Sequence, residues 1–414
     1  MIRRPVGAPV RTTEKVRILR VIARLNMGGP SHHVGLLSTE LDPERYETLL
    51  LHGDVPSGED SLEPAVRARG ARMARIPGLG PAVHPPNDAR ALAGLVRAIR
   101  AARPDILHTH TAKAGMLGRT AAVLAGEPRP LIVHTYHGHV LEGYFGPARN
   151  ALYRGMERRL APVSDALIGV SQATVDDLVR LGVAPRERFR VIPIGLDLRP
   201  FLEATPADGG AFRSEAGVRD GELLLTWVGR LAPIKRVDLL LRALAHARAE
   251  GAPVRLALVG DGALRPELER LAADLGVAPY VYFAGYRAAM VPVAAASDIA
   301  VLSSDNEGTP VSLIEAAAAA TPAVSTQVGG VRDVVTADTG LIVPAGDHLE
   351  LGRALRTLAT DTGGRMELGA RARSHVAGKF AAERLVSDVT ALYDELAPIE
   401  RRQAKTPLPF SDAS

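Results

Sequence analysis

Two glutamates stand eight positions apart in the stretch Glu-Gly-Thr-Pro-Val-Ser-Leu-Ile-Glu, at Glu307 and Glu315. Thr309 is a favourable N-cap residue and Pro310 a favourable first helical residue. A helix is therefore predicted to begin here, directly after an apolar strand over residues 299–303. Glu307 would lie in the loop before this helix and Glu315 in its second turn, so that two carboxylates flank the start of one helix.

This helix start would also present free backbone amides, which belong to Gly308, Thr309, Val311 and Ser312. A helix N-terminus is positively polarised and its first amides have no intrahelical acceptor, so anionic or hydroxyl-rich ligands bind there. The alternative is a capped helix in solvent, because two glutamates at this spacing arise easily by chance in a chain with 23% charged residues.

Two cations follow another predicted strand end. Arg230 comes directly after Gly229, at the end of a strand over residues 222–228, and Lys235 precedes a helix predicted to begin at Val237. Arginine offers a planar fork of donors and lysine a flexible point charge, so together they could neutralise a diphosphate without a bound metal. A surface charge pair is the alternative.

A glycine pair, Gly28-Gly29, follows the first predicted strand, and Ser31 is predicted to cap a helix over residues 32–41. Paired glycines either form a plain turn or let the backbone pass close to a ligand, because no Cβ intervenes. The pattern is not Gly-x-Gly-x-x-Gly with a downstream acidic residue, which disfavours a dinucleotide-dependent dehydrogenase.

Histidines gather at two further strand ends, as the pairs His108/His110 and His137/His139. Residues i and i+2 of a strand share a face, so each pair could chelate zinc. A third ligand at a clear spacing is lacking, and hydrogen-bonding roles are expected instead. We therefore expect no metal and no cofactor in the site.

These residues must be positioned by two parallel sheets. Strand and helix patterns alternate in both halves of the chain, and ligands of such sheets bind beyond the carboxyl ends of the strands. Prolines and glycines between residues 195 and 205 place the domain boundary there. The predicted organisation is a flexible lead-in over 1–14, a Rossmann-like domain over 15–197, a second over 198–380, a helix over 381–400 that packs back on the first domain, and a disordered tail over 401–414.

Composition agrees with a two-domain enzyme of 414 residues. The absence of cysteine excludes disulfides and thiolate metal sites. No apolar run approaches the roughly 18 residues of a membrane span, so a cytoplasmic protein is expected. Residues 1–200 hold 28 basic and 19 acidic residues, whereas 201–414 hold 22 and 27. The basic half suits an anionic lipid surface or a phosphate-bearing acceptor, with compositional drift as the alternative.

The Glu307–Glu315 frame resembles the donor-site signature of retaining glycosyltransferases of family 4. The stretches from His108 to Arg119 and from His134 to His139 are similar to the N-terminal half of family 4 enzymes that build bacterial surface polysaccharides. The segment Pro193-Ile194-Gly195-Leu196-Asp197 resembles the inter-domain segment of the family. The resemblance implies the α/β GT-B fold, in which two Rossmann-like domains with parallel sheets face each other across a cleft.

The resemblance also implies roles for individual residues. Glu307 would hold hydroxyls of the donor sugar, Glu315 the ribose hydroxyls, and His137 would approach the donor sugar. Arg230 and Lys235 would take the diphosphate. The donor-binding set further includes Gly28, Gly29, Gly308, Thr309, Pro310 and Val311.

The implied activity is that of a hexosyltransferase-type enzyme (EC 2.4). It would move a sugar from a nucleotide diphosphate sugar, a UDP-sugar, to a hydroxyl acceptor in cell-surface polysaccharide or glycolipid synthesis, without a metal. The expected partners are the donor and a lipid-linked acceptor, with peripheral contact at the inner face of the membrane and no nucleic acid. A non-hydrolysing sugar-nucleotide epimerase and a non-catalytic sugar-nucleotide binding protein are the alternatives.

Overall fold

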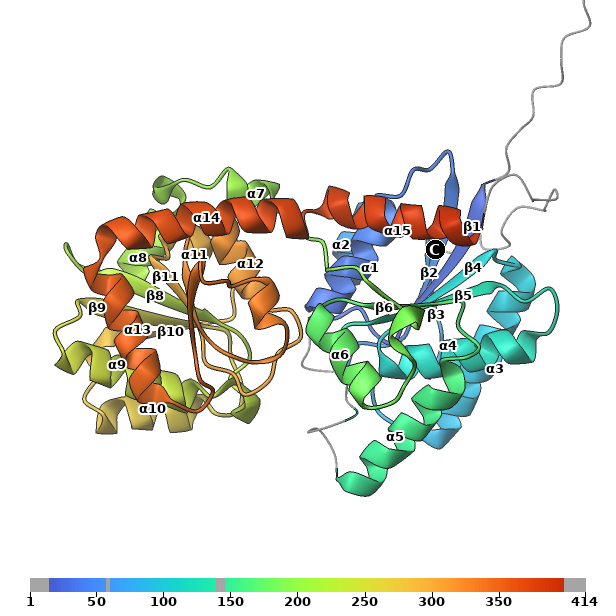
Figure 1. Ribbon diagram of the computed structural model, residues 1–414, viewed down its shortest axis with the longest axis horizontal. Helices are drawn as coiled ribbons and strands as arrows, with labels where there is room; N and C mark the ends of the chain where they lie inside the picture. Colours follow the sequence, from blue (N-terminus) through green and yellow to red (C-terminus); the bar gives the residue numbers. More distant parts are fainter. Residues whose placement is uncertain (1–14, 57–59, 139–140, 142–145, 398–414) are drawn as a thin grey trace, which may run out of the picture.

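The computed structural model describes residues 15–56, 60–138, 141 and 146–397 (Figure 1). The expected lead-in over 1–14, the whole of the expected tail over 401–414 and His139 lie outside these residues. The described chain forms two α/β lobes, which Figure 1 shows side by side. One pair of C-terminal helices spans both lobes.

The first lobe is built on a seven-stranded parallel sheet with the strand order β3-β2-β1-β4-β5-β6-β7. Its strands are β1 (Val16–Ile22), β2 (Tyr46–His52), β3 (Met73–Arg75), β4 (Ile106–His110), β5 (Leu131–Tyr136), β6 (Ala166–Gly169) and β7 (Phe189–Val191). Its helices are α1 (Gly29–Thr39), α2 (Glu63–Ala68), α3 (Pro85–Ala102), α4 (Ala112–Ala125), α5 (Pro147–Leu160) and α6 (Gln172–Arg180). Every residue of β1 is buried, as expected for a parallel strand that helices cover on both faces.

The second lobe repeats the plan with a six-stranded parallel sheet in the order β10-β9-β8-β11-β12-β13. Its strands are β8 (Leu223–Val228), β9 (Val254–Val259), β10 (Val281–Gly285), β11 (Ile299–Leu302), β12 (Ala323–Thr326) and β13 (Gly340–Val343). Its helices are α7 (Arg199–Leu202), α8 (Gly210–Glu215), α9 (Val237–Ala249), α10 (Arg265–Asp274), α11 (Val291–Ala296), α12 (Val311–Ala318) and α13 (His348–Thr360). The two lobes confirm the predicted GT-B class of fold.

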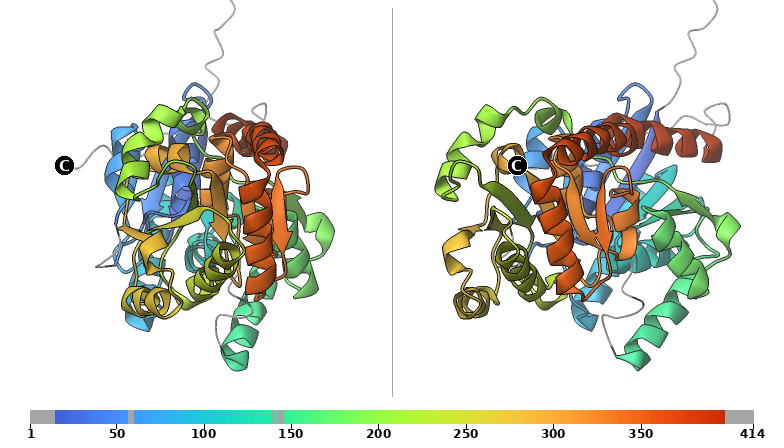
Figure 2. Two further views of the ribbon diagram at one scale, coloured as in Figure 1. Left: turned by 90° about the vertical axis from the view of Figure 1, so that its left-hand side faces the viewer. Right: turned by 60° about the vertical axis from the view of Figure 1, so that its left-hand side comes forward.

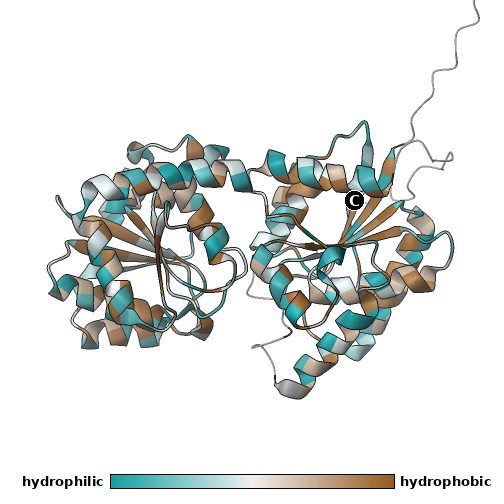
Figure 3. Ribbon diagram, in the orientation of Figure 1, coloured by the Kyte–Doolittle hydropathy of each residue, from teal (hydrophilic) through white to brown (hydrophobic). Residues whose placement is uncertain are grey.

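Apolar side chains are concentrated in the sheets and on the helix faces that cover them. Figure 3 shows hydrophobic residues along the strands of both lobes and hydrophilic residues on the outer helix surfaces. Trp227 of β8 is 2% exposed and is among the largest fully buried side chains. No helix among the described residues is both long and apolar enough to cross a membrane.

The two last helices connect the lobes (Figures 1 and 2). Helix α14 (Thr362–Phe380) lies along the second lobe, and α15 (Ala382–Leu396) packs on the first. Leu385 and Val389 of α15 belong to the same buried cluster as Val16 and Ile106 of the first sheet. Arg384 donates hydrogen bonds to the carbonyls of Pro193 and Ile194, at 2.8 and 2.7 Å.

The sequence reasoning did not anticipate α14. Only Gly369, Ala372, Val376 and Phe380 of its 19 residues are buried, and glycines interrupt the apolar pattern. The amphipathic signal is therefore weak, although Asp361 caps the helix by accepting from the amide of Gly364 at 2.9 Å.

A buried ion pair fixes α4 and α5 to the strand that ends at the histidines. Arg119 donates to both carboxylate oxygens of Glu157 at 2.8 Å, and Tyr136 donates to the same carboxylate at 2.7 Å. Arg119 is fully buried, and the neighbouring carboxylate raises its pKa further against the opposing effect of burial.

Replacing Arg119 by Ala is expected to lower the free energy of unfolding by about 3–5 kcal/mol, because Glu157 is then buried without a counter-charge. Urea denaturation followed by circular dichroism measures the change. Arg67→Ala in the exposed Arg67–Glu63 pair is the matched control and should cost less than about 1 kcal/mol. If the two substitutions lowered the free energy of unfolding equally, the buried Arg119–Glu157 pair would not stabilise the fold as described.

Candidate functional site

Helix α12 begins one residue later than predicted. Pro310 is the N-cap, with φ −76° and ψ 98°, and the first helical residue is Val311. Thr309 is therefore in the loop and does not cap the helix, and its buried hydroxyl has no partner among the described residues. Proline has no amide hydrogen to leave unsatisfied, so this position suits it as well as the predicted one.

The predicted amides nevertheless remain available at this helix start. Those of Gly308, Thr309, Val311 and Ser312 donate to no described residue. The first backbone bonds of α12 come from Leu313 and Ile314, both to the carbonyl of Pro310. A positively polarised group of donors thus lies between the two glutamates.

Glu307 is held in this loop by two contacts. Its Oε1 accepts a hydrogen bond from Lys235 Nζ at 2.5 Å and one from Ser304 Oγ at 2.6 Å. The Lys235 and Glu307 side chains are 26% and 12% exposed, so the pair is only partly screened by water. Ser303 Oγ also donates to the carbonyl of Lys235 at 2.9 Å, which ties the two loops together.

The downstream Gly329-Gly330 pair packs against the Glu307 loop. Gly329 has φ +44°, and a Cβ on it would lie 1.8 Å from the carbonyl oxygen of Glu307. Gly330 donates its amide to the carbonyl of Gly308 at 2.9 Å. The pair therefore supports the loop through its backbone.

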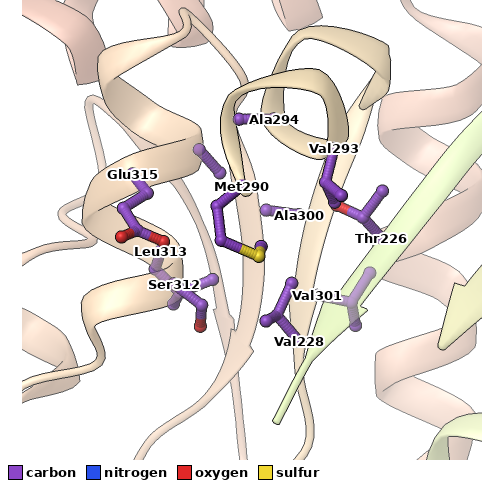
Figure 4. Close-up of a pocket in the computed structure, with 11 residues that line it drawn as sticks. Thr226, Val228, Met290, Val293, Ala294, Ala300, Val301, Ser312, Leu313 and Glu315 are labelled. Carbon is purple, nitrogen blue, oxygen red and sulfur yellow. The ribbon is translucent and has the colours of Figure 1, made fainter. Parts of the chain in front are cut away.

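Glu315 lies in the second turn of α12 and lines a small cavity together with Ser312, Met290 and Val228. Figure 4 shows its carboxyl group next to Ser312, with Met290 and Val228 across the cavity. No described cation pairs with it. Burial raises the pKa of the Glu315 carboxyl to about 7.

Arg230 is exposed at the end of β8 and forms no ion pair with a described residue. It does not approach Glu307 through any described hydrogen bond, whereas Lys235 does. The two predicted cations therefore differ in this structure: Lys235 is already paired, and the Arg230 side chain projects into solvent.

The glycine pair of the first lobe faces α12. A Cβ on Gly29 would lie 3.2 Å from Cγ2 of Val311, so the start of α1 comes close to the start of α12. Gly28 is the N-cap of α1 in extended backbone, which any residue can adopt. The predicted cap was wrong: Ser31 lies inside α1, and its hydroxyl donates to the carbonyl of Arg24 and to Asn26.

His137 lies at the same junction. A Cβ on Gly308 would be 3.1 Å from the carbonyl oxygen of His137. Its Nε2 is 3.1 Å from Nδ1 of His110, and its ring makes an edge contact with His33 at 4.8 Å between centroids. Burial lowers the pKa of His137 to about 3 and holds the pKa of His33 and His110 well below 6.5, so these imidazoles are neutral at pH 7.

His108 has a separate set of partners. Its Nδ1 is 2.6 Å from the hydroxyl of Tyr393 on α15 and 3.1 Å from Arg20, and its Nε2 is 2.8 Å from Thr135. The expectation of hydrogen-bonding roles fits His108, which is enclosed in the protein.

Three contributors were missed by the sequence reasoning. Ser304 holds Glu307, Met290 forms one wall of the cavity, and His33 joins the histidine group. His33 follows the glycine pair within the same loop and helix, and this proximity is the signal that could have revealed it. No comparable signal exists for Met290.

Models of two glycosyltransferase domains match this chain. The model described as Glycosyltransferase Family 4 matches residues 27–199, and that of Glycosyl transferases group 1 matches residues 222–361. The D-inositol 3-phosphate glycosyltransferase of Xylanimonas cellulosilytica is 34% identical over 69% of this chain and 72% of its own length. The putative glycosyltransferase EpsD of Bacillus subtilis is 27% identical over 72% of this chain and 78% of its own length.

Solved structures agree on the architecture. Anabaena HepE, in complex with UDP and glucose, has a TM-score of 0.79 at 21% identity, over 92% of this chain and all of that one. WaaG, a glycosyltransferase involved in lipopolysaccharide biosynthesis, has a TM-score of 0.69 at 19% identity. The match covers 92% of this chain and 100% of WaaG. With the two domain models and a 34% identical relative, these likenesses show that the chain belongs to the family 4 glycosyltransferases with the GT-B fold.

Proposed function

We propose that this glycosyltransferase uses a UDP-sugar and transfers the sugar with retention to a hydroxyl acceptor in surface polysaccharide or glycolipid synthesis. The observation that carries the proposal is the start of α12, where free amides lie between Glu307 and Glu315, and Lys235 contacts Glu307. This arrangement offers donors for a diphosphate and carboxylates for two sets of sugar hydroxyls. The UDP bound to Anabaena HepE supports uridine as the base.

Each group then has a role. The amides of α12, Lys235 and Arg230 bind the diphosphate and stabilise its charge as the glycosidic bond breaks. Glu307 binds hydroxyls of the donor sugar, and Glu315 binds the ribose hydroxyls. Gly28 and Gly29 let the first lobe approach the donor phosphates.

Retention is proposed through a front-face path. Among the described residues, no carboxylate forms a hydrogen bond or an ion pair with His137, whose hydrogen-bond partner is His110. A departing phosphate oxygen, held by Lys235 and the amides, can take the proton of the acceptor hydroxyl. His137 approaches the sugar from the first lobe, and its carbonyl lies next to Gly308.

The acceptor is proposed to carry phosphate or a lipid. The name of the Xylanimonas relative, a D-inositol 3-phosphate glycosyltransferase, supports a phosphate-bearing acceptor. For a lipid-linked acceptor, α5 is the proposed contact, since Leu152 is 61% exposed and Arg159 is exposed one heptad later on the same face. Arg158 is engaged in the fold, because it donates to the carbonyls of Leu181 and Gly182.

Glu315→Ala is expected to weaken UDP binding about 10- to 150-fold, because a charged acceptor of ribose hydrogen bonds is worth roughly 1.5–3 kcal/mol. Isothermal titration calorimetry with UDP, ADP and GDP measures the affinity and the base preference. Glu367→Ala, at an exposed carboxylate of α14, is the control and should bind like the parent. Equal affinity of parent and Glu315→Ala would remove Glu315 from the site.

The same titration should depend on pH. With a pKa of about 7, Glu315 gains its charge as the pH rises from 6 to 8, and the carboxylate is the form that accepts ribose hydrogen bonds. UDP affinity should therefore increase over this range more in the parent than in Glu315→Gln. The variant is the control, because the titration of UDP itself affects both proteins equally. Identical pH profiles would contradict the raised pKa as a property of the binding site.

Transfer is expected to continue after dialysis against EDTA, because Arg230, Lys235 and the helix amides supply the positive charge. Release of UDP from UDP-sugars in the presence of acceptor measures the rate. Conversion of the UDP-sugar into its epimer without acceptor, and without net release of UDP, would favour an epimerase. Loss of activity with EDTA and recovery with Mg²⁺ or Mn²⁺ would overturn metal-free transfer.

Vesicles that contain anionic lipid should bind the protein at low salt and release it at high salt, since each basic residue near the surface adds about 1 kcal/mol. Cosedimentation measures this binding. Leu152→Ser with Arg159→Glu should weaken it, whereas Leu349→Ser with Arg270→Glu, at exposed positions of α13 and α10 on the second lobe, should not. If the protein stays in the supernatant at low salt, the proposed membrane contact of α5 is contradicted and a soluble acceptor is favoured.

A further inference from the structure

Three histidines from separate elements of the first lobe meet beside the donor-site loop. His33 comes from α1, His110 from the end of β4, and His137 follows β5. One ring nitrogen from each lies within 4.8 Å of the others. This set differs from the two His-x-His pairs of the sequence, because it takes one histidine from each pair and adds His33.

Four of the six ring nitrogens in this group lack partners, while His110 Nδ1 and His137 Nε2 face each other at 3.1 Å. Both nitrogens of His33, Nε2 of His110 and Nδ1 of His137 are buried and without a hydrogen-bond partner among the described residues. His33 is 1% exposed. A buried polar atom with no partner is costly, and in native proteins such atoms usually meet water, an ion or a ligand.

The chemistry of the group selects a particular kind of ligand. Three neutral imidazoles are the donor set of a zinc site with one open position, with Zn–N distances of roughly 2.0–2.1 Å. Tetrahedral bonds of that length separate the nitrogens by roughly 3.4 Å. His110 Nδ1 and His137 Nε2 are already 3.1 Å apart, and one nitrogen of each of the three rings lies within 4.8 Å of the others, so the rings must draw closer together to complete the set.

We propose that His33, His110 and His137 form a binding site for a divalent transition-metal ion such as Zn²⁺. Mg²⁺ and Ca²⁺ prefer oxygen ligands and would not bind here. The fourth coordination position would take an anion, because the guanidinium of Arg20 contacts the adjacent His108 at 3.1 Å and adds positive charge. The same positive charge weakens the affinity for the metal and favours hydroxide or chloride at the open position.

The site has a consequence for transfer that rests on the proposed function. A metal ion on His137 would withdraw this side chain from the donor sugar. Zn²⁺ would therefore inhibit an enzyme that needs no metal for transfer, and a chelator would relieve the inhibition.

Metal binding is tested on the full chain after EDTA treatment and gel filtration. Competition with a chromophoric chelator should show one equivalent of Zn²⁺ bound, and Co²⁺ should give the intense visible absorption of a four-coordinate site. His33→Leu should weaken Zn²⁺ binding at least tenfold. His32→Leu, at the adjacent histidine of α1, should bind like the parent.

Circular dichroism and UDP binding show whether His33→Leu is folded with its donor site intact, and His33→Asn provides a second variant if it is not. The proposed site would be overturned if the parent bound no stoichiometric Zn²⁺. It would also be overturned if His32→Leu and His33→Leu lost affinity for Zn²⁺ equally. In transfer assays, Zn²⁺ should lower the rate of the parent but not that of His33→Leu relative to its own zinc-free rate. Zinc binding without inhibition would uphold the site and count against the role of His137 in transfer.

Discussion

The close packing of three backbone loops at the start of α12 is the constraint on which the site depends. Gly329 lies so near the carbonyl of Glu307 that a Cβ would stand 1.8 Å away, and Asp305 donates its amide to the carbonyl of Ile234 at 2.9 Å. The Glu307 loop is thus fixed on both sides by backbone contacts. Lys235 and Glu307 meet because their loops are held together, and the ion pair alone could not impose that position on two partly exposed side chains.

Helices α14 and α15, which connect the two lobes, fix the position of this loop relative to the first lobe. Leu196 donates its amide to the carbonyl of Phe380 at 2.9 Å, and a Cβ on Gly195 would lie 2.5 Å from Cβ of Leu385. The two segments that join the lobes therefore lie against each other. Tyr393, farther along α15, contacts His108 of β4 at 2.6 Å. One continuous series of contacts leads from the crossing to the strand that carries His110.

Local patterns revealed the strands, most helices and the order of the two lobes, because parallel strands are apolar throughout and loops carry glycine and proline. Local patterns also placed Glu307 in the loop before a helix, Glu315 in the second turn of that helix and Lys235 just before another helix. They failed for α14, where glycines weaken the apolar stripe, and for the cap at Thr309, since Pro310 serves as N-cap here. They could not bring His33 to His137, because that contact depends on how α1 and β5 meet in space.

The ion pair in the donor-site loop also bears on how a diphosphate would enter. The Lys235 ammonium is occupied by Glu307 at 2.5 Å, so a diphosphate must compete with a carboxylate for this cation. A diphosphate that succeeds would leave Glu307 held by Ser304 alone and free to accept hydrogen bonds from sugar hydroxyls. Binding of the diphosphate at Lys235 would thereby free Glu307 to bind the sugar. A ligand without a diphosphate has no means of separating the pair, which favours the intact nucleotide sugar over a free sugar.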